Sequence, residues 1–154
     1  MTTPSTVELS PLAVGTKAPD FDLPASGGVQ VKLSDYAGKN LIIVFYPKDQ
    51  TPGCTKQLCA LQADTEKFKA LNTAFIGSNP ASQESHERFS EKEGYTFPIV
   101  VDAERTMARD YHALKEDCKG IQRTVYIVDE TGVIRYAEQG LPSDEVLMEA
   151  IKGF

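Results

Sequence analysis

Residues 41–46 read LIIVFY, and they are followed by PKDQ at 47–50 and by TPGCTKQLC at 51–59. Six consecutive apolar residues of this kind are typical of a strand that is covered on both faces of a sheet. Thr51 and Pro52 then have the sequence of a helix N-cap followed by proline at the first helical position. The stretch therefore predicts a central strand, a short loop and a helix that begins at about Pro52.

Apolar runs and turn residues on either side of this stretch predict the remaining elements. We expect a β-hairpin around Gly27 and Gly28, since glycines suit a tight turn. We expect further strands at 73–77, 97–101, 123–129 and 133–137, and helices at 52–68, 81–92, 102–111 and 142–151. This order of elements predicts an α/β domain of three layers around a mixed central sheet.

The length and composition are those of one globular domain. The chain has 154 residues, of which 41% are hydrophobic and 25% charged, and a chain of this size can form a normal core without disulfide bonds. Residues 1–12 have neither the basic start nor the apolar core of a secretion signal. We therefore expect a polar tail at 1–12, a single domain at 13–154 and a cytoplasmic location.

The charge balance argues against two classes of partner. Lys and Arg total 16 against 22 Asp and Glu, which gives a net charge of -6, and the sequence has no cluster of basic residues. An acidic chain of this kind disfavours binding to nucleic acid and to anionic membranes. The run at 41–46 is the longest strongly apolar stretch, far shorter than the roughly 20 residues of a membrane-spanning helix.

Three cysteines, Cys54, Cys59 and Cys118, are an odd number and are not expected to form permanent disulfides in a cytoplasmic protein. Cys54 is the third residue of the predicted helix, where free backbone N–H groups and the positive end of the helix dipole favour a thiolate. Thr51 precedes it by three residues, the spacing of a capping box. The alternative is that Thr51 only caps the helix and Cys54 is a small buried apolar residue, the commoner state of a free cysteine.

Cys59 lies five residues after Cys54. In an ideal helix this spacing separates the two Cα atoms by roughly 8.6 Å, whereas a disulfide needs less than about 7 Å. The two sulfurs therefore join only if the first turns of the helix unwind. The spacing differs from the C-x-x-C of thiol–disulfide exchangers and favours reaction at Cys54 followed by capture by Cys59. The alternative leaves Cys59 as a bystander near a polar face with Gln62 and Glu66.

These residues resemble those of a known family. The pattern Pro47-x-x-x-Thr51-x-x-Cys54, preceded by Phe45 and Tyr46, resembles the active-site signature of the peroxiredoxins. With the added second cysteine the pattern is similar to the bacterioferritin-comigratory protein, or peroxiredoxin Q, subfamily. The likeness extends over nearly the whole chain and includes the segments 18–21, 33–39 and 123–129 and Gly132.

The resemblance implies a thioredoxin-like fold and a thiol peroxidase that reduces hydrogen peroxide and organic hydroperoxides. By position, Cys54 matches the peroxidatic cysteine and Cys59 the resolving cysteine, so a Cys54 sulfenic acid would be captured as a Cys54–Cys59 disulfide. The implied electron donor is thioredoxin or a similar dithiol, and no metal or organic cofactor is required. The resemblance also implies a role in antioxidant defence and a monomer.

The resemblance further assigns the groups around the reactive sulfur. Thr51 matches the hydroxyl beside the peroxidatic cysteine, Arg123 the guanidinium that completes the pocket, and Pro47 the proline that shields it. The backbone N–H groups of Gly53 and Cys54 would help to stabilise the departing oxygen. Without such a motif, Arg123 would be an ordinary surface arginine at the end of a strand.

Three other residues are expected to lie outside the site. Cys118 falls in a polar loop before the strand at 123–129, where we expect a bystander, with a second resolving or intermolecular thiol as the alternative. His86 and His112 lack metal-ligand spacing to the cysteines, and we expect each to be an exposed helix residue. Two other functions use the same cysteines: a thiol–disulfide oxidoreductase, and a redox sensor whose helix unwinds on oxidation.

Overall fold

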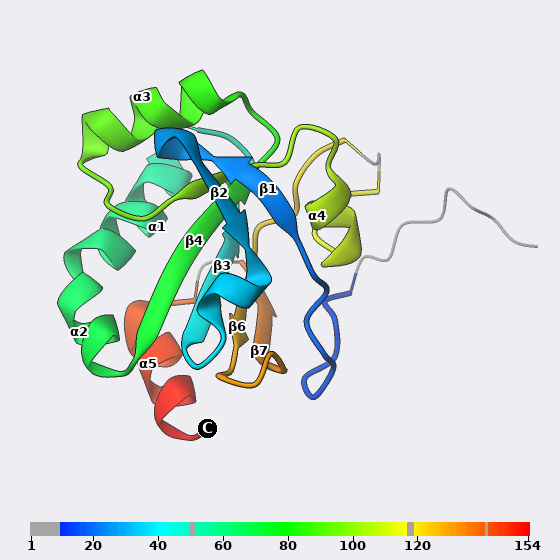
Figure 1. Ribbon diagram of the computed structural model, residues 1–154, viewed down its shortest axis with the longest axis vertical. Helices are drawn as coiled ribbons and strands as arrows, with labels where there is room; N and C mark the ends of the chain where they lie inside the picture. Colours follow the sequence, from blue (N-terminus) through cyan, green and yellow to red (C-terminus); the bar gives the residue numbers. More distant parts are fainter. Residues whose placement is uncertain (1–9, 50–51, 117–118, 141) are drawn as a thin grey trace, which may run out of the picture.

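The computed structural model describes residues 10–49, 52–116, 119–140 and 142–154, with only the backbone described at Pro52 and Cys54. Within these residues, a seven-stranded sheet has the strand order β2-β1-β5-β4-β3-β6-β7 (Figure 1). β4 runs parallel to β3 and β5, and the other neighbouring strands are antiparallel, which confirms the predicted mixed sheet. The strands are β1 Asp22–Ala25, β2 Val29–Lys32, β3 Asn40–Phe45, β4 Thr73–Asn79, β5 Ile99–Val101, β6 Thr124–Val128 and β7 Ile134–Gln139.

β3 is the central strand that the apolar run predicts. All of its residues are buried, because successive side chains point to opposite faces of the sheet and both faces are covered. Leu41, Ile43 and Phe45 belong to the core on one face. Ile42 and Val44 belong to the core on the other face. Packing on both faces thus explains why the strand is apolar from Leu41 to Phe45, after the buried Asn40 at its start.

Helices cover both faces of the sheet, as a three-layer domain requires. Leu58 of α1, Phe68 of α2, Phe89 of α3 and Leu147 of α5 share the core that contains Ile42. α4 contributes to the opposite core and lies apart from the other helices in Figure 1. The helices are α1 Pro52–Ala63, α2 Thr65–Ala70, α3 Gln83–Glu93, α4 Thr106–Asp110 and α5 Asp144–Lys152, with 3-10 turns at Ser26–Gly28 and Leu33–Tyr36. None of the helices in the described ranges has the length and apolar character needed to cross a bilayer.

The predicted N-terminal hairpin is confirmed and extends the main sheet. Gly27 and Gly28 connect β1 to β2 with positive φ angles of 83° and 73°, a conformation that glycine adopts without strain. Ala25 at the end of β1 pairs with Val100 of β5. The hairpin is therefore part of the seven-stranded sheet rather than a separate unit.

The helix expected at 52–68 is in fact two helices. α1 ends at Ala63 and α2 begins at Thr65, with Asp64 as the break between them. The Thr65 hydroxyl donates to the Gln62 carbonyl at 2.6 Å. Such side-chain bonds to nearby backbone compete with the helical pattern, which explains the break.

The helix expected at 102–111 is shorter than predicted and begins at Thr106. The N-cap residue is Arg105 and not Asp102 as expected, but the Asp102 side chain still binds the first turn of the helix. The Asp102 carboxylate accepts hydrogen bonds from the backbone N–H groups of Met107 and Ala108, at 3.1 and 2.8 Å. The intervening residues include a turn, and the Asp102 carboxylate lies at the N-terminus of the helix.

Candidate active site

The loop after β3 and the first turn of α1 hold the first cysteine of the predicted pair. β3 ends at Phe45 and α1 begins at Pro52, the position that the Thr-Pro sequence predicts. Cys54 is therefore the third residue of a 12-residue helix. The first backbone N–H groups of a helix have no helical partner, and the helix dipole favours negative charge beside them. Thr51 lies outside the described residues.

Arg123, the residue before β6, reaches this turn of α1. In the antiparallel pairing of β3 with β6, Phe45 lies opposite Thr124, so Arg123 stands beside the loop that follows β3. Nη1 of Arg123 donates to Oε1 of Gln57 at 3.2 Å. Nη2 lies 3.3 Å from the point where a Cβ on Gly53 would stand. The guanidinium thus lies directly against the backbone of the first turn of α1.

The positive charge of Arg123 has no acidic partner in the described ranges, where none of the ion pairs involves it. Arginine keeps its charge at every working pH and presents N–H donors in a fixed plane. A nearby cation and a helix N-terminus both favour the thiolate form of a cysteine. The arrangement can therefore stabilise an anionic sulfur at Cys54 and the negative charge that develops on an adjacent oxygen.

Cys59 lies in the same helix and is held by polar groups from another part of the chain. Its side chain is partly buried and packs against the core that contains Leu58. Sγ donates to Oε1 of Glu93 at 3.4 Å and lies 3.5 Å from the Tyr95 hydroxyl. The thiol is therefore fixed between α1 and the end of α3 rather than free on a polar face.

The segment after α3 also holds α1 at two further points. The Tyr95 hydroxyl donates to the Thr55 carbonyl at 3.4 Å. Further along α1, Nε2 of Gln62 donates to the Thr96 hydroxyl at 3.1 Å, and the Thr96 N–H donates to Oε1 of Gln62 at 2.9 Å. The bonds from Tyr95 must break before the first turns of α1 can unwind.

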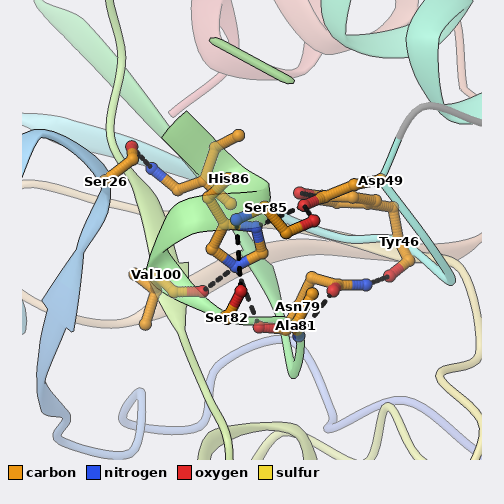
Figure 2. A network of polar contacts seen from close by, with 10 residues as sticks. Ser26, Tyr46, Asp49, Asn79, Ala81, Ser82, Ser85, His86 and Val100 are labelled. Atoms are coloured by element: carbon orange, nitrogen blue, oxygen red, sulfur yellow. Dashed lines mark hydrogen bonds and ion pairs between the residues drawn. The ribbon is translucent and has the colours of Figure 1, made fainter. Parts of the chain in front are cut away.

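A buried polar cluster that the sequence pattern does not predict joins the loop between β3 and α1 to α3. The expected exposure of His86 is wrong, because its side chain is 0% exposed. Its Nδ1 lies 2.7 Å from Oδ2 of Asp49, a residue of this loop (Figure 2). The spacing to Phe89 could have indicated burial, since residues three apart share one face of a helix.

Of the other residues selected from the sequence, the structure describes Pro47 and His112. Pro47 is exposed at the start of the loop, and Cys118 lies outside the described residues. His112 lies in a turn after α4 instead of in a helix, and its Nδ1 is 3.1 Å from the Ser10 carbonyl. Across the described part of the chain, no group of His, Cys, Asp and Glu side chains could hold a metal ion.

Known proteins are similar to this chain over most of its length. A model of the AhpC/TSA family matches residues 14–137. Peroxiredoxin Bcp of Bacillus subtilis (strain 168) is 39% identical over 127 residues, which cover 79% of this chain and 81% of that protein. Peroxiredoxin Bcp of Escherichia coli (strain K12) is 32% identical over 134 residues, which cover 83% and 86%. The chain therefore belongs to the AhpC/TSA family.

Solved structures show which type of AhpC/TSA protein the chain is similar to. The alignment with peroxiredoxin Q of Xanthomonas campestris has a TM-score of 0.83 at 29% identity and covers 91% of this chain and 97% of that one. A PrxQ of Xylella fastidiosa gives a TM-score of 0.83 at 27% identity, covering 94% and 96%. The protein is a thiol peroxidase of the Bcp/peroxiredoxin Q type with a thioredoxin-like fold. The family and the fold that the sequence predicts are both confirmed.

Proposed function

We propose that this peroxidase reduces hydrogen peroxide and organic hydroperoxides at Cys54 and captures the resulting sulfenic acid with Cys59. The position of Arg123 is the observation that carries the proposal. Its guanidinium lies 3.3 Å from a Cβ position on Gly53, in the turn of α1 that contains Cys54. Peroxide reduction needs a thiolate and a cation beside the reacting oxygens, and this contact supplies the cation.

In the first step, the Cys54 thiolate attacks one oxygen of the peroxide, so an S–O bond forms and the O–O bond breaks. The sulfur is oxidised to a sulfenic acid, and the departing oxygen takes up a proton to give water or an alcohol. Arg123, the Thr51 hydroxyl and the backbone N–H groups of Gly53 and Cys54 would stabilise the charge on the departing oxygen. Pro47 would shield the pocket from the solvent side.

In the second step, the Cys59 thiol attacks the sulfenic sulfur. An S–S bond forms, the S–O bond breaks, and the hydroxyl leaves as water with the thiol proton. Two residues five apart in an intact helix are too distant for this bond, so the first turns of α1 must unwind. The contacts of Cys59 with Glu93 and Tyr95, at 3.4 and 3.5 Å, hold the thiol in the folded helix and set how readily this happens.

We infer that a dithiol such as thioredoxin then reduces the Cys54–Cys59 disulfide by thiol–disulfide exchange. Because both cysteines lie in one helix of one chain, a monomer can complete the cycle. The working groups are a sulfur, a hydroxyl, a guanidinium and backbone N–H groups, so the proposal includes no metal or organic cofactor. A reducing cytoplasm would supply the dithiol, and the activity would serve antioxidant defence.

The experiment measures peroxide consumption with thioredoxin and its reductase for the wild type and three serine variants. We expect Cys54→Ser to lose the activity and Cys59→Ser to consume about one equivalent and then stop. Cys118→Ser is the matched control and should turn over like the wild type. Wild-type rates from Cys54→Ser would refute the proposal, and sustained turnover by Cys59→Ser would assign resolution to another thiol.

Two other outcomes would point to the other candidate functions. Reduction of insulin disulfides at the rate of a dithiol exchanger would indicate a thiol–disulfide oxidoreductase. Consumption of a single equivalent of peroxide by the wild type, despite a working thioredoxin system, would indicate a redox sensor. We expect neither, because the separation of the cysteines in α1 suits a two-step peroxidase.

A further inference from the structure

Asp49 anchors the described part of the loop between β3 and α1. The two residues before Asp49 are exposed, whereas Asp49 itself is 8% exposed. Its Oδ1 accepts a hydrogen bond from the Tyr46 hydroxyl at 2.5 Å. Its Oδ2 accepts one from the Ser85 hydroxyl at 2.7 Å and lies 2.7 Å from Nδ1 of His86 (Figure 2). The Asp49 carboxylate thus ties the loop to the first turn of α3.

The other ring nitrogen of His86 also faces acceptors. Nε2 lies 3.2 Å from the Asn79 carbonyl and 3.1 Å from the Val100 carbonyl. Carbonyl and ionised carboxyl oxygens only accept hydrogen bonds, so both nitrogens are satisfied when the ring is an imidazolium that donates from each. The Asp49–His86 pair therefore joins the loop to α3 and to the ends of β4 and β5.

The pKa of the Asp49 carboxyl is consistent with its pairing with His86. Burial by itself raises the pKa of the Asp49 carboxyl, but the hydrogen bonds from His86, Tyr46 and Ser85 and the charge of His86 outweigh it. The pKa consequently lies below its usual value, and the carboxyl is ionised at neutral pH. A buried ion pair of this kind is a poor source of stability compared with well-packed apolar side chains, so stability alone does not account for it.

A second contact fixes the start of the same loop. Nδ2 of Asn79 donates to the Tyr46 carbonyl at 2.8 Å, and Oδ1 of Asn79 accepts from the Ala81 N–H at 2.8 Å. The end of β3 is therefore bound to the end of β4. Between this point and the first residue of α1, Asp49 is the buried residue of the described loop.

We propose that Asp49 and His86 are positioning residues for the peroxidase reaction, because their ion pair holds the first turn of α1 against Arg123. The inference rests on the proposed function of Cys54. Asp49 lies three residues before α1 and five before Cys54, whereas Arg123 directly precedes β6. Movement of the loop therefore shifts the reactive sulfur relative to the guanidinium, and a misplacement of about 1 Å can lower a rate 100-fold.

The test compares full-length wild type with Asp49→Asn, His86→Gln and the double variant. Rapid mixing with hydrogen peroxide, quenching and mass analysis give the second-order rate constant for oxidation of Cys54. We expect each single variant to lower this constant about tenfold or more, and the double variant to add little, because the two residues act as a unit. Gln83→Ala is the control, since Gln83 lies in α3 and bonds to Glu87, and it should react like the wild type.

A second measurement needs no peroxide and reports on the sulfur directly. The pH dependence of Cys54 alkylation by iodoacetamide, followed by peptide mass, gives the midpoint of thiolate formation. We expect this midpoint to rise by about half a pH unit or more in Asp49→Asn, because the turn moves away from Arg123. An unchanged midpoint and rate constant in a folded variant with a lower melting temperature would show a purely structural role and overturn the proposal. A wild type that consumes no peroxide would refute the proposed function instead, while the alkylation comparison still stands.

Tyr46→Phe tests the same idea if the pair variants do not fold. It removes one hydroxyl contact with Asp49 and keeps a buried aromatic ring. We expect a native circular dichroism spectrum and a rate constant about threefold below wild type. A wild-type rate constant in folded Tyr46→Phe, together with unfolded pair variants, would overturn the proposal.

Discussion

Arg123 lies against Gly53 in the turn of α1 that contains Cys54, so its removal tests the proposed electrostatic stabilisation of the sulfur. Arg123→Lys keeps a charge but loses the planar set of donors that reaches both Gly53 and Gln57. We expect kcat/KM for hydrogen peroxide to fall about 100-fold in this variant and further in Arg123→Gln. Steady-state assays with thioredoxin measure the loss.

The control for Arg123 is Arg135→Gln. Arg135 lies on β7 and pairs with Asp129 at 3.3 Å, so its removal changes the net charge by the same amount away from the site. We expect wild-type kinetics from this variant. An Arg123→Gln protein within about threefold of wild type would contradict the assigned role.

Gly53 offers a substitution that separates activity from stability. A Cβ at this position would stand 3.3 Å from Nη2 of Arg123, so the guanidinium must shift by a few tenths of an ångström. Alanine also favours the helix by roughly 0.5–1 kcal/mol over glycine. We therefore expect Gly53→Ala to be as stable as wild type or more so, yet to react several-fold more slowly with peroxide. Urea unfolding measures the stability of this variant, and peroxide kinetics on the same preparation measure its activity. A stable variant with full activity would show that the close contact between Gly53 and Arg123 is not needed for the reaction.

Individual residues differ in how far the sequence predicts their surroundings. Cys54 could be placed at a helix start because capping is a local property of the chain. The spacing of His86 to Phe89 could have indicated its burial, but its contact with Asp49 could not be predicted, because the two residues are 37 positions apart in the chain. Arg123 could be assigned by resemblance, but its contact with α1 depends on the pairing of β3 with β6.

Among the secondary-structure elements, α1 is the helix whose first turns must unwind before Cys54 and Cys59 can form a disulfide. The Tyr95 hydroxyl contacts both Sγ of Cys59 and the Thr55 carbonyl, at 3.5 and 3.4 Å. Tyr95→Phe removes these contacts, and a hydrogen bond of this type contributes about 1 kcal/mol. We expect disulfide formation after Cys54 oxidation to become about fivefold faster, since local unwinding becomes easier. Quenched-flow mass analysis measures this step.

Gln62→Ala provides the comparison for Tyr95→Phe. Gln62 bonds to Thr96 near the end of α1, beyond both cysteines, so its loss should leave the disulfide step near its wild-type rate. Slower disulfide formation in Tyr95→Phe would mean that the hydroxyl assists the reaction and does not restrain the helix.

Helices and strands could be predicted where a short stretch of sequence determines them. They were predicted less well where contacts between distant residues determine them. The apolar run predicts β3, and the Thr51-Pro52 sequence predicts the start of α1. The spacing of apolar residues predicts one continuous helix face, but the helix is interrupted at Asp64. Such boundaries follow from side-chain bonds that periodicity does not record.

In the molecule as a whole, two carboxyl groups from distant parts of the chain, Asp144 and Asp64, influence each other's ionisation. Asp144 is the first residue of α5, and Asp64 lies at the break between α1 and α2. Burial first, and then the hydrogen bond and charge of Asp64, raise the pKa of Asp144 to about 7. The folded protein thus retains a proton that the unfolded chain releases near pH 4, so the pair makes stability fall as pH rises from about 4 to about 7.

Asp144→Asn should remove this dependence. We expect its free energy of unfolding at pH 8 to exceed that of wild type by about 1 kcal/mol, a modest value because the carboxyl is partly exposed to solvent. Urea unfolding at several pH values between 5 and 8 measures the effect. Glu149→Gln, which removes the exposed pair with Lys152 at 3.3 Å, should keep the wild-type slope. An unchanged slope in Asp144→Asn would disprove the effect.

The overall architecture followed from the alternation of strands and helices, which predicts a three-layer α/β domain with a mixed sheet. The strand order was not available from the same pattern. β3 lies between β4 and β6, and this arrangement brings Arg123 to a helix 66 residues earlier, at Gln57. The site therefore depends on pairings between distant segments, which a single sequence read locally does not specify.

In the proposed cycle, Cys54 and Cys59 form the catalytic disulfide. The most direct measurement adds one equivalent of hydrogen peroxide to the reduced protein, digests it without reduction and identifies the linked peptides by mass. We predict a Cys54–Cys59 linkage, with Cys118 recovered as a free thiol. A Cys54–Cys118 linkage, a disulfide between two chains, or an unmodified Cys54 would contradict the account.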